Sequence, residues 1–374
     1  MCTDLRLLNP GNYGISVRNL DYSDELDTWI GFVPSGTRFV SLTPPVGHGG
    51  PAFAWTSRHN YVNFIGLPAG LVTELIFNTV PDHDKAVSCE AMNDQGLAVA
   101  SLWNDDTQFP DTSKNPDLPL LADFSLVEWL AGTFDTVAAV RAALTAAPPP
   151  FVIWGNLKLP WADWAPAPAH YVVHDAQGDD LVIEILDGVL TLLPSVAGVL
   201  TNEPRLSWHK QNLSNYANLS YFDPSGPMPV FPGVNVSPLG CGSGLLGLPG
   251  DFTPPSRFVR AAVLNLSNAR RNAVGSQLQV IAHALHLADT VAPPFGLNHT
   301  ENGADYTQWQ VVRDHQARRY YIRTCFSTGL QGIDLTTVTF GTFDRSYYVP
   351  LGDVDPTVAF AVPEPPARDV IRPA

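Results

Sequence analysis

The chain of 374 residues carries 21 Lys and Arg against 36 Asp and Glu, which gives a formal net charge of −15. A surface of this sign repels phosphate backbones and anionic lipid, so nucleic acid and membrane surfaces are poor partners. Hydrophobic residues make up 45% of the chain, which allows a sizeable core and argues against global disorder.

Signals for the cellular compartment are few. No stretch is apolar for long enough to cross a bilayer, and the first twenty residues lack a basic segment followed by an apolar core. The four cysteines, at positions 2, 89, 241 and 325, have no CxxC spacing. The sequence therefore predicts a cytoplasmic protein with reduced thiols, no zinc ribbon and no disulfide framework.

The predicted elements begin with short strands separated by turns, at 14–22, 61–67 and 97–103. A helix is expected over 123–147, because apolar residues recur there at helical spacing. Asp123 is its candidate N-cap, and three prolines at 148–150 end it.

Strands resume in the second half of the chain. Turn signals at Gln177-Gly178 and Asp187-Gly188 separate apolar runs, which predicts a β-meander over 170–193. A Pro- and Gly-rich segment at 221–250 is interpreted as an ordered loop. The remaining predictions are helices at 256–270 and 276–288, strands at 310–312 and 320–324, and an extended or disordered tail at 363–374.

This order of elements is not a βαβ succession. Groups of strands alternate with groups of helices, which is typical of antiparallel sheets covered by segregated helices, the α+β class. Because no clear linker divides the chain, we expect a single domain over 1–362.

Cys2 is the first candidate for chemistry. Removal of Met1 would leave a thiol and a free α-amine on one residue, and an α-amine with a pKa of roughly 7.7–8.0 can act as a base near neutral pH. By itself this position means little, because Cys at position 2 also occurs without any function.

Arg18 and Asp21 lie on one predicted strand. Residues three apart point to opposite faces of a strand unless a bulge intervenes. The pair is therefore either an exposed charge pair of little energetic value, or a functional pair with Arg18 near the thiol and Asp21 near the α-amine.

Five blocks of sequence, in order along nearly the whole chain, resemble the choloylglycine hydrolase family, which includes bile salt hydrolases and penicillin V acylases. The blocks are MCT at the start, RNLDY at 18–22, MNDQGL at 92–97, GVLTNEP at 198–204 and GLPGDFTPPSRFVR at 247–260. The resemblance implies an αββα four-layer sandwich of the N-terminal-nucleophile (Ntn) hydrolases. It also implies a homotetramer, supported by the long loop before the last block.

The same resemblance implies roles for five residues. Cys2 is the nucleophile and its freed amine carries the proton. Asp21 orients that amine, Arg18 and Arg257 border the thiol, and Asn202 donates its side-chain amide to the oxyanion. A preorganised neutral donor of this kind is typically worth roughly 3–4 kcal/mol.

Trp103 departs from the pattern of the bile salt hydrolases, which carry Asn there. A Trp at this position resembles the Gram-negative branch of the family, which includes penicillin V acylases and acyl-homoserine lactone acylases. We expect Trp103 to offer its backbone N–H to the oxyanion and its indole to the acyl pocket. Asn104 is a neighbouring pocket candidate, but it is out of register by one residue, which would send its side chain to the other face of the strand. The loop at 221–250 is closer to the bile salt hydrolase branch.

These observations predict an enzyme that hydrolyses a linear N-acyl amide through a Cys2 thioester, without metal or organic cofactor. The acyl group is expected to be bulky and apolar. One alternative is an acyl-homoserine lactone acylase, which Trp103 favours. Another is a non-catalytic binding module in which Met1 still blocks Cys2.

Two further patterns carry less weight. Gly242, Gly244 and Gly247 match the dinucleotide fingerprint as a string, but they follow a loop instead of a strand. His283 and His286 share a face of a predicted helix and could bind a metal. A packing or surface role is favoured for both.

Overall fold

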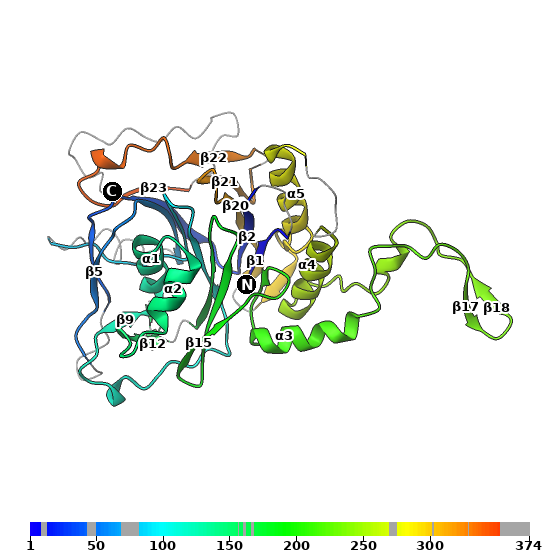
Figure 1. The fold of residues 1–374 in the computed structure, drawn as a ribbon, viewed down its shortest axis with the longest axis horizontal. Helices are drawn as coiled ribbons and strands as arrows, with labels where there is room; N and C mark the ends of the chain where they lie inside the picture. The colour runs from blue at the N-terminus through cyan, green and yellow to red at the C-terminus, as the bar shows by residue number, and fades with distance from the viewer. Residues whose placement is uncertain are drawn as a thin grey trace.

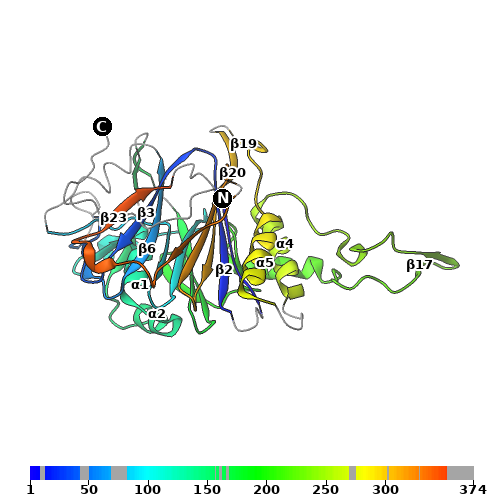
Figure 2. The ribbon, with the colours of Figure 1, turned by 90° about the horizontal axis from the view of Figure 1, so that it is seen from above.

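The computed structural model describes residues 1–8, 13–42, 50–68, 82–155, 157–159, 162–165, 168–268, 275–300, 303–327 and 329–351. Within these ranges two antiparallel sheets stack against each other, and helices cover the outer face of each (Figures 1 and 2). The predicted tail at 363–374 lies outside the described residues, and the single domain over 1–362 stays a prediction.

The first sheet holds the start of the chain, β1, next to its edge strand β16. In the described residues it has seven strands in the order β16-β1-β2-β20-β21-β22, with β19 also paired to β20. Their bounds are β1 (Cys2–Arg6), β2 (Ile15–Tyr22), β16 (Val199–Leu200), β19 (Asn298–Thr300), β20 (Gly303–Asp314), β21 (Arg319–Thr324) and β22 (Gln331–Asp334). In the register of β1 and β2, Cys2 lies opposite Leu20.

The second sheet has eight strands among the described residues, in the order β15-β14-β13-β8-β7-β6-β3-β23. Their bounds are β3 (Leu26–Val33), β6 (Tyr61–Pro68), β7 (Glu90–Asn93), β8 (Ala98–Trp103), β13 (Ala169–His174), β14 (Asp180–Leu186), β15 (Val189–Leu193) and β23 (Tyr347–Pro350). The consecutive antiparallel strands β13, β14 and β15 confirm the predicted β-meander.

Helices cover the two outer faces. The helices α4 (Pro254–Asn268) and α5 (Gln277–Asp289) lie on the first sheet, where Asn19 of β2 donates to the carbonyl of Ala288. The helices α1 (Asp123–Thr133) and α2 (Val137–Leu144) lie on the second sheet, where Tyr171 donates to the carbonyl of Asp123. The order of layers is therefore helix, sheet, sheet, helix, and the α+β prediction is confirmed.

Smaller elements complete the described part of the chain. These are α3 (Leu206–Asn212), β4 (Arg38–Val40), β5 (Ala54–Thr56), β9 (Leu120–Ala122), β10 (Val152–Trp154), β11 (Leu157–Leu159), β12 (Ala162–Ala165), β17 (Met228–Phe231), β18 (Val234–Val236), and the 3-10 helices η2 (Thr112–Lys114), η3 (Leu213–Tyr216), η4 (Ser243–Leu245) and η5 (Phe340–Thr342).

Side chains of β1 alternate between two environments, as the period of a strand requires. Cys2 and Asp4 point toward the second sheet, since their partners are Arg18 and His174 on that side. Leu5 points toward α4 and α5 and packs beside Ala261 and other apolar side chains of these helices. The strand thus places the Cys2 thiol between the two sheets.

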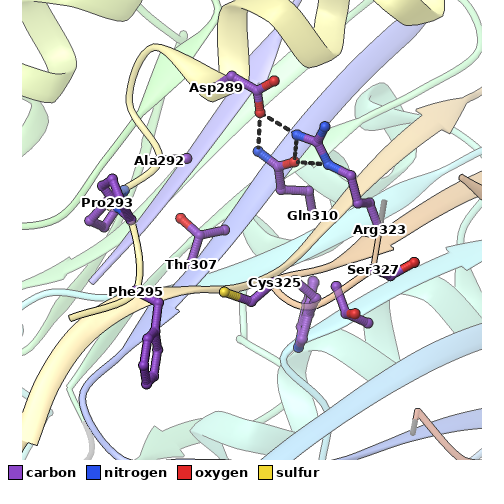
Figure 3. A pocket seen from close by; sticks show the side chains of 12 residues that line it. Asp289, Ala292, Pro293, Phe295, Thr307, Gln310, Arg323, Cys325 and Ser327 are labelled. Atoms are coloured by element: carbon purple, nitrogen blue, oxygen red, sulfur yellow. Dashed lines mark hydrogen bonds and ion pairs between the residues drawn. The ribbon is translucent and has the colours of Figure 1, made fainter. Parts of the chain in front are cut away.

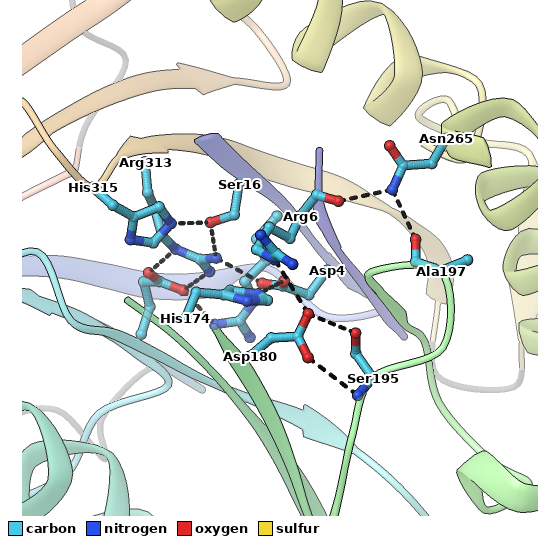
Figure 4. Close-up of polar contacts among 12 residues, drawn as sticks. Asp4, Arg6, Ser16, His174, Asp180, Ser195, Ala197, Asn265, Arg313 and His315 are labelled. Atoms are coloured by element: carbon cyan, nitrogen blue, oxygen red, sulfur yellow. Dashed lines mark hydrogen bonds and ion pairs between the residues drawn. The ribbon is translucent and has the colours of Figure 1, made fainter. Parts of the chain in front are cut away.

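A layer of buried charges lies between the sheets (Figure 4). Asp4 accepts from His174 at 2.7 Å and from Arg313 at 2.8 Å. Burial raises the pKa of Asp4, but Arg313 and His174 more than offset this effect and hold it well below its usual range. Arg313 also donates to Glu90 at 2.6 Å through Nε. Each buried charge in this layer therefore has a partner of opposite sign.

The predicted helix over 123–147 is wrong as one element, because α1 ends at Thr133 and α2 begins at Val137. The Thr136 side chain accepts from the N–H of Ala139 and caps the second helix. Asp123 also differs from its prediction: it is the first residue of α1, not its N-cap.

Other boundaries differ by small amounts or extend. The strand predicted at 310–312 is part of the longer β20, and the helix predicted at 256–270 begins two residues earlier, at Pro254. Proline fits the first turn of a helix because its missing N–H would have no partner there. The last two residues of that prediction, 269 and 270, lie outside the described residues.

The segment at 221–250 projects from the body as a long arm, with the hairpin β17–β18 near its tip (Figures 1 and 2). At its base, the Asp223 carboxylate accepts from the N–H groups of Gly242 and Gly244, both at 2.8 Å. The prediction of an ordered loop missed this hairpin.

Candidate active site

Cys2 is buried between the sheets, and its Sγ lies 3.8 Å from Nη2 of Arg18. Arg18 projects from β2, the neighbour of β1, into the same inter-sheet layer. This contact places a positive charge beside the sulfur atom of Cys2.

Several acceptors hold the Arg18 guanidinium. Nη2 donates to the carbonyl of Ser101 at 2.6 Å, and Nη1 donates to Glu90 at 3.2 Å and to the carbonyl of Cys89. The guanidinium also lies 5.4 Å from the centre of the Trp309 ring. Burial by itself would lower the pKa of Arg18, but the Cys2 and Cys89 thiols and Glu90 more than offset it and raise the pKa.

Asp21 follows an irregularity in the pairing of β2 with β20, between Leu20 and Asp21. A bulge of this kind re-aims a side chain, which is the condition under which Arg18 and Asp21 could serve one site. The Asp21 carboxylate accepts from the Thr307 hydroxyl at 2.6 Å and lies 3.9 Å from Nη1 of Arg257. Burial raises the pKa of Asp21 to about 6, although Arg257 and the N-terminal ammonium act in the opposite direction.

Asn202 lies in the turn that follows β16. Its Oδ1 accepts from the backbone N–H of Cys2 at 2.8 Å and from Nη2 of Arg257 at 2.6 Å. Its Nδ2 donates to the carbonyl of Trp103 at 2.7 Å. One side-chain amide therefore links the nucleophile candidate to the end of β8.

Gly198 explains how β16 reaches this turn. Its φ is +72°, and an added Cβ would lie 2.4 Å from the carbonyl oxygen of Arg6. Glycine is the residue that adopts this conformation without a steric cost, so the GVLTNEP block requires it for geometry.

Arg257 enters the site from the first turn of α4. Its Nη1 donates to the Thr3 hydroxyl at 2.6 Å and to the carbonyl of Cys2 at 2.5 Å. Burial lowers the pKa of Arg257, with Asp21 and Cys2 acting in the opposite direction. Arg18 and Arg257 thus contact different atoms of Cys2: Arg18 faces the thiol and Arg257 holds the backbone.

The structure separates Trp103 from Asn104. Trp103 reaches Asn202 through its carbonyl, and its indole is 40% exposed with Nε1 donating to Asp105. Asn104 is fully buried, and its Nδ2 lies 3.2 Å from Nδ1 of His170. The side chain of Asn104 therefore bonds to β13 of the second sheet and not to Cys2.

Met1 is present at the start of the chain, so the nitrogen of Cys2 belongs to a peptide bond. The Met1 ammonium donates to the carbonyl of Asp21 at 2.6 Å and lies 3.4 Å from Asp305. A positive amino group, that of Met1, therefore lies beside Asp21.

Glu90 and Thr307 contact predicted site residues but are not among the sequence predictions. Glu90 bonds Arg18, and Thr307 bonds Asp21. A charged residue inside the apolar run at the start of β7 is a weak signal for Glu90. Thr307 has no comparable signal, because only the fold brings β20 beside β2.

A pocket of about 390 Å³ opens beside β20 (Figure 3). Asp289, Gln310 and Arg323 form a hydrogen-bonded polar wall, and Phe295 lies on the other side. Two of its lining residues contact the site: Thr307 is the partner of Asp21, and the ring of Trp309 lies beside Arg18. Cys2 is not among its lining residues.

In the described parts of the chain, no group of three or more His, Cys, Asp or Glu side chains is placed to hold a metal ion. No helix in those parts has the length and apolar character that would cross a membrane. All four cysteines are free thiols.

Solved structures of two proteins share the fold. The C2A variant of conjugated bile acid hydrolase from Clostridium perfringens superimposes with a TM-score of 0.75 at 22% identity, covering 96% of this chain and 99% of the other. Penicillin V acylase from Agrobacterium tumefaciens gives a TM-score of 0.70 at 20% identity, covering 94% and 92%. At these identities the likeness concerns the fold alone.

Sequence relatives point to the same group. A bile salt hydrolase/transferase of Clostridium perfringens is 26% identical, over 90% of this chain and 92% of its own. A penicillin V acylase of Pectobacterium atrosepticum is 25% identical, over 91% and 82%. The family model of linear amide C–N hydrolases, choloylglycine hydrolase family, matches residues 2–348. This match spans almost the whole chain, and the protein belongs to the choloylglycine hydrolase family of linear amide C–N hydrolases.

Proposed function

We propose that the protein hydrolyses a linear N-acyl amide with Cys2 as its nucleophile. The observation that carries the proposal is the convergence of Arg18, Asn202 and Arg257 on different atoms of Cys2. These three side chains come from β2, the turn after β16, and α4, so local sequence alone cannot account for their meeting.

Removal of Met1 would turn the Cys2 peptide nitrogen into an α-amine. That nitrogen lies 2.8 Å from Oδ1 of Asn202, which gives the new amine an acceptor. Asp21 would supply a negative charge nearby, and its partner Thr307 would fix the orientation of the carboxylate. The α-amine is then the base that takes the thiol proton.

The reaction follows in two halves. The Cys2 thiolate attacks the acyl carbonyl, a C–S bond forms, and the oxygen becomes an oxyanion. The protonated α-amine gives its proton to the leaving nitrogen as the C–N bond breaks, which leaves a thioester. Water, deprotonated by the same amine, then attacks the thioester and restores the Cys2 thiol as the acid departs.

Asn202 is suited to the oxyanion because its side-chain amide has two hydrogens. One hydrogen goes to the carbonyl of Trp103, at 2.7 Å, and this bond fixes the plane of the amide. The second hydrogen is available to the reacting carbonyl. The backbone N–H of Trp103 is the proposed second donor.

The substrate class follows from relatives and from Trp103. Relatives named as bile salt hydrolases and as penicillin V acylases are similarly distant from this chain, so neither name decides the substrate. Both kinds of substrate carry a bulky apolar acyl group, and we propose an acyl group of this kind. The half-exposed indole of Trp103 lies next to the site and is suited to line an acyl pocket. The same residue supports acyl-homoserine lactones as the alternative substrates.

We also propose a homo-oligomer, a tetramer by analogy with the family, held together by the arm at 221–250. The arm exposes a set of large apolar side chains, which a protein in water normally covers. They are Phe222, Met228, Val230, Phe231, Val234, Val236, Leu239 and Leu246. A cytoplasmic location is consistent with the four free thiols.

The test compares initial rates of the wild type and Cys2→Ala on penicillin V, penicillin G, glycocholate, taurocholate and homoserine lactones of short and long acyl chain. Intact mass spectrometry of each preparation reports whether Met1 is absent. We expect one acyl class to be hydrolysed by the wild type and none by Cys2→Ala.

The substrate that is hydrolysed fastest decides between penicillins, conjugated bile salts and acyl-homoserine lactones. Equal activity in Cys2→Ala would refute the nucleophile. Loss of Met1 without hydrolysis of any substrate in the panel would instead favour a non-catalytic binding module.

A further inference from the structure

The turn that carries Asn202 is held by side chains from outside it. Residues 201–205 lie between β16 and α3 and form neither strand nor helix. His170 of β13 lies 2.9 Å from the carbonyl of Thr201, and Asp106 accepts from the N–H of Arg205 at 2.8 Å. The position of the Asn202 amide therefore depends on residues that do not reach Cys2 themselves.

His209 acts on Asn202 directly. This residue of α3 is fully buried, and its Nε2 lies 2.9 Å from the backbone carbonyl of Asn202. A carbonyl oxygen can only accept, so Nε2 carries the hydrogen and the imidazole tautomer is defined. Nδ1, the other ring nitrogen, is buried and has no hydrogen-bond partner among the described residues.

Packing fixes the plane of the His209 ring. It stacks on Phe258 with the ring centres 4.5 Å apart and the planes 15° from parallel. Phe258 follows Arg257 on α4. One helix therefore carries both the ring that packs on His209 and the guanidinium that bonds the Asn202 side chain. Burial lowers the pKa of His209 to about 4, so the ring is neutral near pH 7 and offers one N–H.

We infer that His209 is a positioning residue for the oxyanion donor Asn202: its N–H fixes the Asn202 backbone so that the side-chain amide stays aimed at the reacting carbonyl. The inference rests on the proposed function. An oxyanion donor must lie within about 2.7–3.1 Å of the developing charge, so a small rotation of the Asn202 peptide is enough to weaken catalysis.

The first test compares His209→Leu, which has no donor, with His209→Gln. The Nε2 of glutamine is separated from Cβ by as many bonds as the Nε2 of histidine, so it can donate to the same carbonyl. We expect His209→Leu to lower kcat about 10- to 100-fold, with KM nearly unchanged, and His209→Gln to recover most of the loss.

Asn265→Leu is the matched control for stability. Asn265 of α4 is also fully buried and also holds backbone, donating to the carbonyls of Arg6 at 2.7 Å and Ala197 at 2.8 Å (Figure 4). It contacts none of the five proposed catalytic side chains. This variant should lose thermal stability as His209→Leu does, but keep the wild-type kcat.

The second test repeats His209→Leu in an Asn202→Ala background. A positioning role requires Asn202, so the second substitution should change kcat less than twofold when the amide is already absent. A merely structural role would lower kcat by the same factor in both backgrounds.

The outcomes separate the two proposals. Wild-type kcat in His209→Leu, or equal losses in both backgrounds, would overturn the role of His209 alone. Wild-type kcat in Asn202→Ala would overturn the oxyanion role and this inference with it. Retained activity in Cys2→Ala would refute the proposed function itself.

Discussion

At the scale of single residues, the Arg18 guanidinium is shared between the Cys2 thiol and the Glu90 carboxylate. It faces the Cys2 thiol on one side and Glu90 on the other, and Glu90 also bonds Arg313 and Tyr320. One carboxylate therefore serves two guanidiniums. Arg313 has a second carboxylate partner in Asp4, so a change at Glu90 alters the charge that Arg18 presents to the sulfur of Cys2.

This balance predicts the effect of Glu90→Gln. Removing the negative charge while keeping the shape should make the field at Cys2 more positive. We expect Cys2 to react with iodoacetamide roughly three- to tenfold faster at pH 7, because a more positive field at its sulfur favours nucleophilic attack. Mass spectrometry of the N-terminal peptide measures this rate without interference from the exposed Cys241 and Cys325.

The control for that experiment is Glu128→Gln, which removes another fully buried carboxylate from a different layer of the protein. It should leave the alkylation rate of Cys2 unchanged. A slower reaction in Glu90→Gln would mean that Glu90 matters through the placement of Arg18 and not through its charge.

Single residues also mark the limit of sequence-based prediction. Cys2, Arg18, Asn202 and Arg257 were proposed from blocks of a family resemblance, and the fold brings them together. His209 was not predicted: it follows the TNEP block by five residues and resembles any polar residue on a helix. Its partner is a backbone carbonyl, and sequence patterns carry no signal for such a contact.

Elements were predicted well where the apolar period is regular. The β-meander over 170–193 has glycine turns and clean alternation, and α5 differs from its predicted range by one residue at each end. The break between α1 and α2 was missed because apolar residues continue across it. The decisive feature is the Thr136 cap, a local bond that competes with helix continuation.

The arm gives a prediction at the scale of an element. Met228 pairs with Val236, so residues 228–236 can be replaced by two glycines without pulling on the base of the arm. We expect light scattering to show that the shortened protein forms a smaller oligomer than the wild type, because the apolar contact of the hairpin is lost. Circular dichroism should show an unchanged fold, because the hairpin lies outside the two-sheet body.

A point variant sharpens the test of the arm. Phe231→Asp places a charge on the hairpin, and Leu278→Asp places one on a similarly exposed apolar site of α5. Dissociation in the first variant alone would support the hairpin as the contact. The same molar mass in the wild type and in both arm variants would contradict it.

At the scale of the whole molecule, the buried ionisable groups make stability depend on pH. Glu128 lies between α1 and the second sheet, where it accepts from Tyr61 at 3.2 Å and from Asn63 at 3.0 Å. Burial raises its pKa from 4.5 to about 7, against the effect of these hydrogen bonds. The folded chain therefore keeps a proton that the unfolded chain loses near pH 4.5.

The sign follows from linkage. The contribution of Glu128 is fully present below pH 4.5 and is lost as the pH rises to about 7. Glu128→Gln mimics the protonated form, so we expect it to match the wild type at pH 4 and to be more stable by roughly 2–3 kcal/mol at pH 8. Urea denaturation at the two pH values measures the difference.

Asp180→Asn is the control of opposite sign. Burial tends to raise the pKa of Asp180, but His174, Ser195 and Arg6 together lower it. This variant should be less stable than the wild type at pH 8, with a smaller difference at low pH. A Glu128→Gln variant that is equally destabilised at both pH values would contradict the account.

The charge layer between the sheets also has an evolutionary consequence. Asp4 and Glu90 each join two cations or histidines, so replacing any one member unbalances the buried charge of the layer and destabilises the fold. Single substitutions at these positions are therefore rarely neutral. Across divergent relatives, the residues at positions 4, 90, 174 and 313 should therefore be retained together or replaced together, although they lie on four different strands.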